Sequence, residues 1–461
     1  MNILELAKVD MVLKRNEYET LQHGPFKPWN ELKISRDKNL MFYIKTSPLG
    51  RASANQLLKE KLEGNHAIVL KNKINDCEIS IEGLYPKNYL QNPEGTLPEI
   101  YGALSVIVDF SKKRKNKKYT IDWLENIDDN CALLWPLQSK CLINLPKKLW
   151  ALTAGRQYVY CKVDGNDFLL IKNQESNKNT DKASGFILYN NSSSDEVRWK
   201  IKNCLSFLLG RPLICTGYSI LDKNCDLVLS NYHYAETNKE LFLKMTTSPP
   251  VLLDSTRAGI VQRITGTILS AKLDKIYSNY EKYDLSYLFW LFWHAACDDT
   301  SPNGIMLYAA CIEALQKKYS DENNGTILAP KDWHALLGEL KDKVLQVNMQ
   351  EKLKNQLITN LELINRRGLK QRKLDNFLDH LGLKLNRNER EAWAHRHNVA
   401  HGDCITADYK AFMKATKILK TIFTRILLCV TGASDEYIDY CYEGCPIKNI
   451  KSGDEVQIND N

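Results

Sequence analysis

The spacing of apolar residues changes about halfway along the chain, from the two-residue alternation of strands to the longer period of helices. In the first half, 77–82 alternates between polar and apolar residues, and 101–110 contains a run of large aliphatic residues. The strongest hairpin signal is the pair 158–163 and 168–171, which flanks the polar, glycine-containing stretch 164–167. Residues 1 to about 235 are therefore predicted to be rich in β-strands.

One amphipathic helix interrupts these predicted strands. Apolar residues recur at helical spacing in 196–209, and Gly210 follows as a stop signal. Another strand pair is predicted around 218–220 and 227–229. The basic run 112–118 stands between two predicted strands, so it is either the solvated tip of a hairpin or a surface that binds nucleic acid.

The second half of the chain, from about residue 236, has a helical period. Apolar residues at helical spacing predict helices at 285–297, 304–317, 333–345, 353–364 and 408–430. Such a series favours an α-helical bundle. The predicted fold class is α+β multidomain, with a β-rich N-terminal module at 1–235, a connector at 236–280, a helical bundle at 281–432 and a C-terminal extension at 433–461.

Composition agrees with a water-soluble protein of more than one domain. The chain has 461 residues, of which 44% are hydrophobic and 26% charged, and this length favours two or three domains. Its formal net charge of +8 permits an acidic partner such as nucleic acid without requiring one. The 13 cysteines follow no paired framework, and no secretory signal or membrane span is evident. We therefore expect a cytoplasmic protein with no membrane partner.

The stretch of the sequence richest in candidate chemistry lies near the C-terminal end. Arg396 is followed after four residues by His401, and Gly402 comes next as a helix stop. Asn388 and Glu391 form an N-x-x-E pattern that predicts a capping box at the start of the same helix. Arginine binds phosphate through a permanently charged planar fork, and histidine transfers protons near neutral pH. These two side chains are the minimum set for cutting a phosphodiester without a metal.

This stretch resembles the Arg-x4-His motif of HEPN-domain ribonucleases, in which a polar residue, here His397, often follows the arginine. The resemblance covers roughly 280–432, and the order of helices fits, because that family carries its motif on the penultimate core helix. It implies a metal-independent endoribonuclease with Arg396 and His401 as catalytic residues. His397 and Asn398 are expected to support them, and no cofactor or metal is expected.

The motif predicts a homodimer. Five residues of an α-helix turn through roughly 500°, which leaves Arg396 and His401 about 140° apart around the axis. One helix therefore does not aim both groups at one phosphate, whereas two copies related by a two-fold axis do. HEPN ribonucleases are expected to build a composite site in this way.

The architecture of the whole chain is similar to that of ApeA-type anti-phage proteins, in which a module precedes a C-terminal HEPN domain. The resemblance implies antiviral defence by abortive infection, with RNA cleaved once a phage-derived trigger has been sensed by the N-terminal module. The alternative from another functional class is a non-catalytic HEPN-like module that binds RNA or a protein partner.

Several residues near the motif have two interpretations. Glu313 is either an exposed carboxylate or a partner that orients Arg396 across the bundle. His397, His401 and Cys404 form an alternative zinc site, whereas His395 is expected to face solvent. A second basic cluster either binds RNA or is an exposed connection between helices, and its members are Arg366, Arg367, Lys370, Arg372 and Lys373.

Overall fold

The computed structural model describes two compact units, Met1–Ser278 and Asn279–Asn461. The first unit is β-rich and the second is dominated by helices, so the predicted mixed α+β class is confirmed. The described residues are 9–22, 31–36, 41–45, 67–86, 100–112, 116–127, 146, 149, 158–172, 184–233, 249–251, 256–257, 260–261, 266–298, 301–322, 328–402, 409–442 and 445–454.

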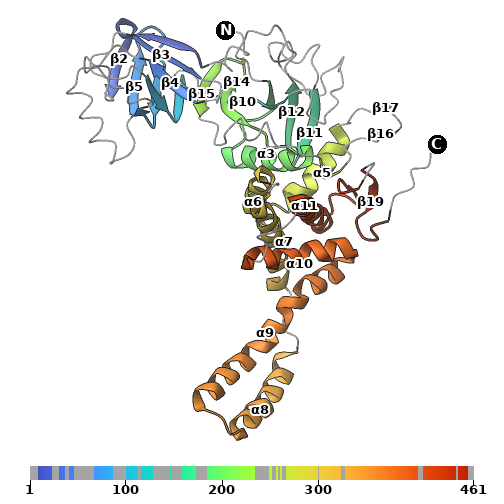
Figure 1. Cartoon of the computed structure of the whole chain (residues 1–461). Helices are drawn as coiled ribbons and strands as arrows, with labels where there is room; N and C mark the ends of the chain where they lie inside the picture. Colours follow the sequence, from blue (N-terminus) through green and yellow to red (C-terminus); the bar gives the residue numbers. More distant parts are fainter. Residues whose placement is uncertain are drawn as a thin grey trace. The chain divides into compact units, whose positions relative to one another are not determined.

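The first unit contains a long antiparallel sheet with the strand order β11-β12-β13-β10-β14-β15-β9-β6-β5-β2 (Figure 1). Its strands are β2 (Tyr18–Gln22), β5 (Ala67–Asn72), β6 (Glu78–Glu82), β9 (Ser105–Asp109), β10 (Lys117–Leu124), β11 (Tyr158–Val163), β12 (Asn166–Lys172), β13 (Gly185–Tyr189), β14 (Cys215–Asp222) and β15 (Leu227–His233).

A smaller antiparallel sheet shares a hydrophobic core with one end of the long sheet. Its strands, in spatial order, are β1 (Met11–Lys14), β3 (Glu31–Arg36), β4 (Phe42–Lys45), β8 (Ile100–Ala103) and β7 (Tyr85–Pro86). Ile34 and Phe42 from this sheet lie in one buried cluster with Leu70 and Ile81 from the long sheet. Every second side chain of β5, β6 and β9 is buried, which is the alternation of strands that cover a core on one face.

Two predictions in this unit are wrong. The expected single strand at 101–110 is two strands, β8 and β9, that belong to different sheets and are separated at Leu104, whose side chain is 53% exposed. The basic run 112–118 is not the tip of a hairpin, because β9 pairs with β6 and β15, whereas β10 pairs with β13 and β14. Lys112 pairs with Glu78 at 2.9 Å, and 113–115 lie outside the described residues.

Two helices pack against the long sheet, α5 (Gly266–Ser278) at its β11 end and α3 (Asp195–Leu209) at β10 and β14. Helix α3 begins at the predicted position and ends at Gly210, which adopts the left-handed conformation. Helix α5 packs against β11 so closely that a Cβ on Gly266 would lie 2.0 Å from the Tyr160 carbonyl oxygen. The predicted β11–β12 hairpin is confirmed, and its two-residue turn, Asp164 and Gly165, has positive φ at both positions, as the twist of hairpins favours.

The second unit is built from six helices in its described part, followed by a short strand pair. The helices are α6 (Leu285–Cys297), α7 (Pro302–Glu322), α8 (Pro330–Gln346), α9 (Glu351–Leu381), α10 (Arg387–His401) and α11 (Tyr409–Thr431), and the strands are β18 (Glu436–Ile438) and β19 (Ile447–Asn449). Helices α6, α7, α10 and α11 form the bundle, in which the ring of Phe292 lies 5.6 Å from Tyr308 and 5.5 Å from Phe423.

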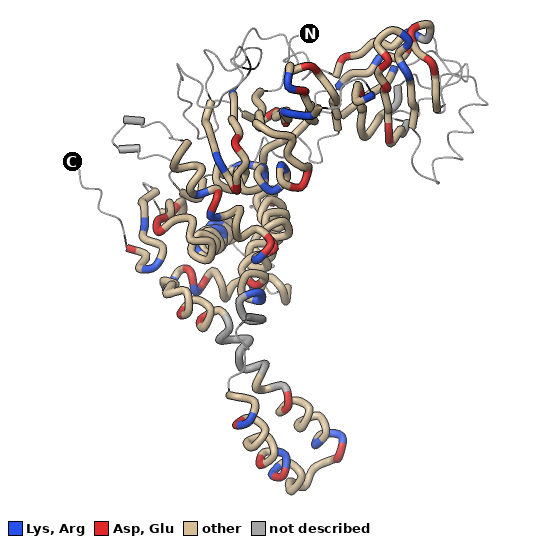
Figure 2. The backbone as a smooth tube through the Cα atoms, turned by 180° about the vertical axis from the view of Figure 1, so that it is seen from behind, with Lys and Arg blue, Asp and Glu red and all other residues tan. Residues whose placement is uncertain are grey.

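Helices α8 and α9 form an antiparallel hairpin that extends away from the bundle (Figure 1). Basic and acidic residues are interspersed along it (Figure 2). Helix α9 continues well beyond the predicted 353–364, so the basic cluster at 366–373 lies within a helix and is not a connection between helices. The side chains of this cluster lie outside the described part of the structure.

The observed division of the chain differs from the predicted boundaries. The last residues of the expected connector, 236–280, form α5 and belong to the first unit, which ends at Ser278. The expected extension, 433–461, is part of the second unit, since Arg425 of α11 donates a 3.0 Å hydrogen bond to the Ile450 carbonyl oxygen. Among the helices that are described, none has the length and apolar character needed to cross a bilayer.

Candidate functional site

Helix α10 carries the Arg-His motif, and both of its ends are capped. The Asn386 side chain accepts a 3.0 Å hydrogen bond from the backbone of Glu389, whose carboxylate accepts one of 2.8 Å from the Asn386 backbone. This reciprocal pair is a capping box. The prediction from Asn388 and Glu391 was therefore two residues too late. The predicted stop at Gly402 is confirmed, with φ of 77°.

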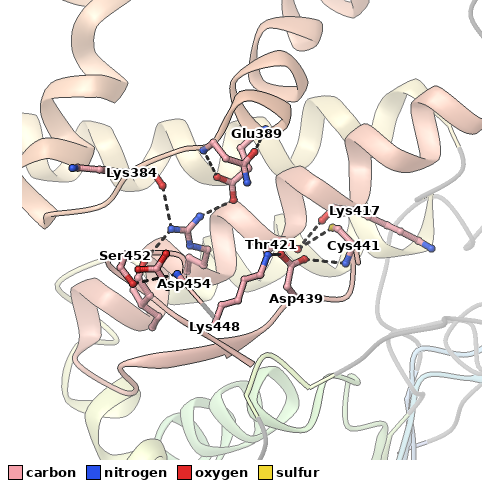
Figure 3. Close-up of polar contacts among 12 residues, drawn as sticks. Lys384, Glu389, Lys417, Thr421, Asp439, Cys441, Lys448, Ser452 and Asp454 are labelled. Carbon is pink, nitrogen blue, oxygen red and sulfur yellow. Dashed lines mark hydrogen bonds and ion pairs between the residues drawn. The ribbon is translucent and has the colours of Figure 1, made fainter. Parts of the chain in front are cut away.

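A buried ion pair fixes the start of α10 against α11 (Figure 3). Arg425 donates to the Glu389 carboxylate at 2.6 Å, and the two side chains are only 3% and 7% exposed. The same guanidinium donates to the carbonyl oxygens of Lys384, at 3.3 Å, and Ile450, at 3.0 Å. Its carbon also lies 5.0 Å from the centre of the Tyr437 ring. One residue thus joins α11, the α9–α10 loop and the C-terminal segment.

Arg396 is held by contacts on three sides. Its Nε and one terminal nitrogen lie 3.2 and 3.1 Å from the same Glu313 oxygen, across the bundle on α7. The other terminal nitrogen donates to the Trp393 carbonyl oxygen at 3.3 Å and to His397 Nε2 at 2.9 Å. The guanidinium carbon also lies 3.7 Å from the centre of the Trp393 ring. The Arg396 side chain is consequently only 13% exposed.

Burial and the Glu313 carboxylate have opposite effects on the pKa of Arg396. Burial lowers the pKa of the guanidinium, while the Glu313 carboxylate favours its charged form. Because a guanidinium has no acceptor, His397 Nε2 must accept the hydrogen bond and carries no proton in this arrangement. The pairing of Glu313 with Arg396 is one of the two interpretations that the sequence left open. The expected supporting roles of Glu313 and His397 remain predictions.

The other motif residues differ in their exposure. His401 is the last residue of α10 and is exposed, and Asn398 is exposed one turn earlier. The sequence predicted that His395 faces solvent, and this prediction is wrong. Its ring packs 5.7 Å from that of Phe412, and its Nε2 is buried without a hydrogen-bond partner. Arg396 and His401 therefore lie on one helix, the first turned into the bundle and the second open to solvent.

Sequence reasoning missed two residues that shape this site. Trp393 supplies the aromatic face against which Arg396 lies, and the signal was available, because residues three apart on a helix are neighbours. Arg425 gave no such signal, since its partner Glu389 is distant in the sequence and on another helix.

The structure shows no metal cluster within the described ranges. No three His, Cys, Asp or Glu side chains in these ranges are placed to share a metal ion, and Cys404, of the alternative zinc set, lies outside them. A cavity of about 130 Å³ lies at the N-terminal end of α10, away from His401, and Asn386, Lys414 and Tyr442 contribute to its lining. Its acidic lining residues are already paired, Glu389 with Arg425 and Asp439 with Lys448.

No protein-family model matches the chain, and comparisons with curated proteins and with solved structures give no match. The chemistry of the site is therefore argued from the contacts of its own residues.

Proposed function

We propose that the second unit is a metal-independent endoribonuclease of the HEPN type. The observation that carries the proposal is the arrangement on α10. Arg396 is fixed by Glu313 and Trp393, while His401 is exposed in the last helical turn just before Gly402. An immobilised guanidinium and an exposed imidazole on the same helix supply a charge for phosphate and a group that moves protons.

The proposed reaction needs only RNA and these side chains. His401 takes the proton of a ribose 2′-hydroxyl as its oxygen attacks the adjacent phosphorus. The bond to the 5′-oxygen of the next nucleotide breaks, and that oxygen takes up a proton. The products are a 2′,3′-cyclic phosphate and a 5′-hydroxyl. General acid–base catalysis of this kind contributes roughly 10²–10⁴ in rate.

Arg396 stabilises the negative charge that develops on the phosphate oxygens. In the structure its donors already serve Glu313, the Trp393 carbonyl and His397. The guanidinium has five N–H groups and these contacts occupy at most four of them, so a phosphate that binds through two N–H groups has to replace one of these acceptors. Glu313 is the one most easily displaced, because its side chain is 55% exposed and returns to water at low cost. Glu313 then acts as a positioning residue that holds the guanidinium until RNA binds.

The composite site requires a second copy of the chain. Arg396 points toward α7, and His401 lies about 140° around α10, so the two do not converge within one protomer. A two-fold axis beside the ends of two α10 helices would bring the arginine of one protomer to the histidine of its partner. RNA would be guided by the basic cluster of α9, and the first unit would sense a phage-derived trigger in a cytoplasmic defence response. The role of the cluster follows from its place just before the motif helix in the sequence, and the sensing role follows from the architectural resemblance.

The alternative function is a non-catalytic module that binds RNA or a protein. The contacts of Arg396 favour it, since every donor-bearing nitrogen of the guanidinium has a partner within the protein. In that case Arg396 has a structural role, and His401 is a cation that complements the C-terminal end of the helix dipole.

Cleavage of purified total RNA in EDTA distinguishes the two functions. If the protein is a ribonuclease, the natural protein should cleave RNA, and the His401→Ala and Arg396→Ala variants should not. Arg387→Ala, on the same helix but 91% exposed, is the matched control and should cleave normally. Mixing the two inactive variants should restore activity, because each mixed dimer contains one complete site. RNA binding without cleavage at any enzyme concentration would support the non-catalytic module instead.

A further inference from the structure

A cysteine in the first unit lies among charged side chains from several elements. Cys215 begins β14, and Lys202 of α3 donates to its sulfur at 3.4 Å. The same Lys202 lies 3.0 Å from the Asp122 carboxylate of β10. His233, at the end of β15, also hydrogen-bonds to the thiol. The thiol therefore has two partners that favour its thiolate, Lys202 and His233, while its sulfur also lies 3.4 Å from the Gly217 carbonyl oxygen, to which the protonated thiol can donate.

Charged side chains from several elements surround Cys215. Asp122 is fully buried and accepts hydrogen bonds from Arg198 and, at 3.3 Å, from the Tyr189 hydroxyl. Arg36 of β3 donates to the backbone carbonyls of Thr216 and His233 and interacts electrostatically with Cys215 and Glu125. The cations Arg36, Arg198 and Lys202 face three carboxylates, those of Asp122, Glu125 and Asp195, and Asp195 pairs with Arg198 from an exposed position. Among these cations, Lys202 is the one that donates a hydrogen bond to the sulfur of Cys215.

The titration of the thiol agrees with this geometry. Burial by itself raises the pKa of Cys215, but the charge of Lys202 and the hydrogen bond from His233 outweigh it, so the pKa is lowered. The pKa of Lys202 is raised, because Asp122 and Cys215 together outweigh the effect of burial. Cys161 shows what burial does without such partners, since its thiol pKa rises to about 12.

We propose that Cys215 is a nucleophilic thiolate, held by Lys202 and His233, that reacts with small soft electrophiles such as hydrogen peroxide. The residue is only partly exposed, which favours a small reagent over a bulky disulfide. With peroxide, the sulfur attacks one oxygen, an S–O bond forms and the O–O bond breaks. Sulfur is oxidised by two electrons, the peroxide is reduced, and the products are a sulfenate and water. This modification site is independent of the nuclease proposed for the second unit.

The test is the pH profile of alkylation of the full-length native protein by iodoacetamide, followed at Cys215 by peptide mass spectrometry. The rate should reach half its plateau at a lower pH than for N-acetylcysteine in the same buffers. Partial burial changes the plateau but not this midpoint. Lys202→Met should move the midpoint upward. Lys200→Met is the matched control, because Lys200 lies on the same helix but pairs with the exposed Glu196, and it should leave the midpoint unchanged.

The experiment is decisive even if Lys202→Met fails to fold, because the midpoint pH of Cys215 alkylation is measured on the natural protein. No alkylation of Cys215 in the native protein, or a midpoint at or above that of N-acetylcysteine, would overturn the proposal. Brief exposure to hydrogen peroxide followed by dimedone should add one dimedone at Cys215 and none at the buried Cys161. An alkylated Cys215 that gives no dimedone adduct would exclude peroxide as its reagent.

Discussion

Replacing Arg425 with methionine should loosen the end of the bundle that holds α10. The substitution keeps much of the side-chain volume but removes the charge. It leaves the Glu389 carboxylate, which is 7% exposed, without its 2.6 Å partner. It also removes the donors to the carbonyl oxygens of Lys384 and Ile450. The Asn386 cap depends on the same carboxylate, so the start of α10 loses its support from α11.

The expected cost follows from the burial of the pair. Breaking a buried ion pair by removing one partner costs roughly 3–5 kcal/mol, because the remaining charge stays desolvated. The exposed pair Arg387–Glu391, at 91% and 61%, provides the matched control, since exposed pairs are worth about 0–1 kcal/mol. Arg387→Met should therefore change little. The double variant Arg425→Met with Glu389→Leu should recover much of the loss, because no unpaired charge remains buried.

Hydrogen exchange measured by mass spectrometry on the full-length chain gives the local readout. Each 1.4 kcal/mol changes the opening equilibrium about tenfold, so amides of α10 and α11 should exchange about 10² to several thousand times faster in Arg425→Met. Peptides from the β-sheets should be unaffected. If Arg425→Met and Arg387→Met change the exchange of α10 equally little, the argument that this pair anchors the helix is refuted.

Two further predictions concern the caps and the basic runs. Asn386→Ala should destabilise α10 by about 1 kcal/mol in the same exchange experiment, whereas Asn388→Ala should have little effect; the reverse order would place the capping box at the later position. Charge reversal in 366–373 should weaken binding of a labelled RNA, and flatten its salt dependence, more than charge reversal in 112–118, because the first cluster shares a unit with the motif. A larger loss from the 112–118 variant would make the first unit the principal RNA-binding surface.

Local signals in the sequence predicted several elements well. The bounds of α6 agree with the apolar segment 285–297, and the β11–β12 hairpin was evident from its glycine-containing turn. The end of α10 was also predictable, because Gly402 adopts a positive φ at low cost. In each case the determining interactions lie within a few residues of one another in the sequence.

Predictions failed where a choice depended on contacts distant in the sequence. Two overlapping N-x-x-E patterns, 386–389 and 388–391, lie at the start of α10. The capping box forms at the first of them, where Arg425 of α11 binds the glutamate. The predicted helix ended at residue 364, before the basic cluster, yet α9 continues through Gly368, because Phe377 and Leu378 beyond it are buried. A glycine within a helix costs about 1 kcal/mol, which such burial outweighs.

The sequence proposed the candidate residues but not their arrangement. The motif selected Arg396 and His401, whose catalytic roles remain predictions, and the pairing of Arg396 with Glu313 was one of two open alternatives. The packing of His395 against Phe412 could not be foreseen, since it depends on how α11 packs beside α10. That packing leaves His395 only partly exposed, whereas His401 is open to solvent.

The central claim, RNA cleavage through the 2′-hydroxyl without a metal, is tested most directly by the ends of the products. A single-stranded RNA and the same sequence with 2′-O-methyl groups should be incubated with the protein in EDTA. The account predicts that only the unmodified RNA is cut, into fragments with 2′,3′-cyclic phosphates and 5′-hydroxyls, and that His401→Ala cuts neither. Cleavage of the methylated strand, fragments with 5′-phosphates, or activity only after a divalent metal is added would contradict it.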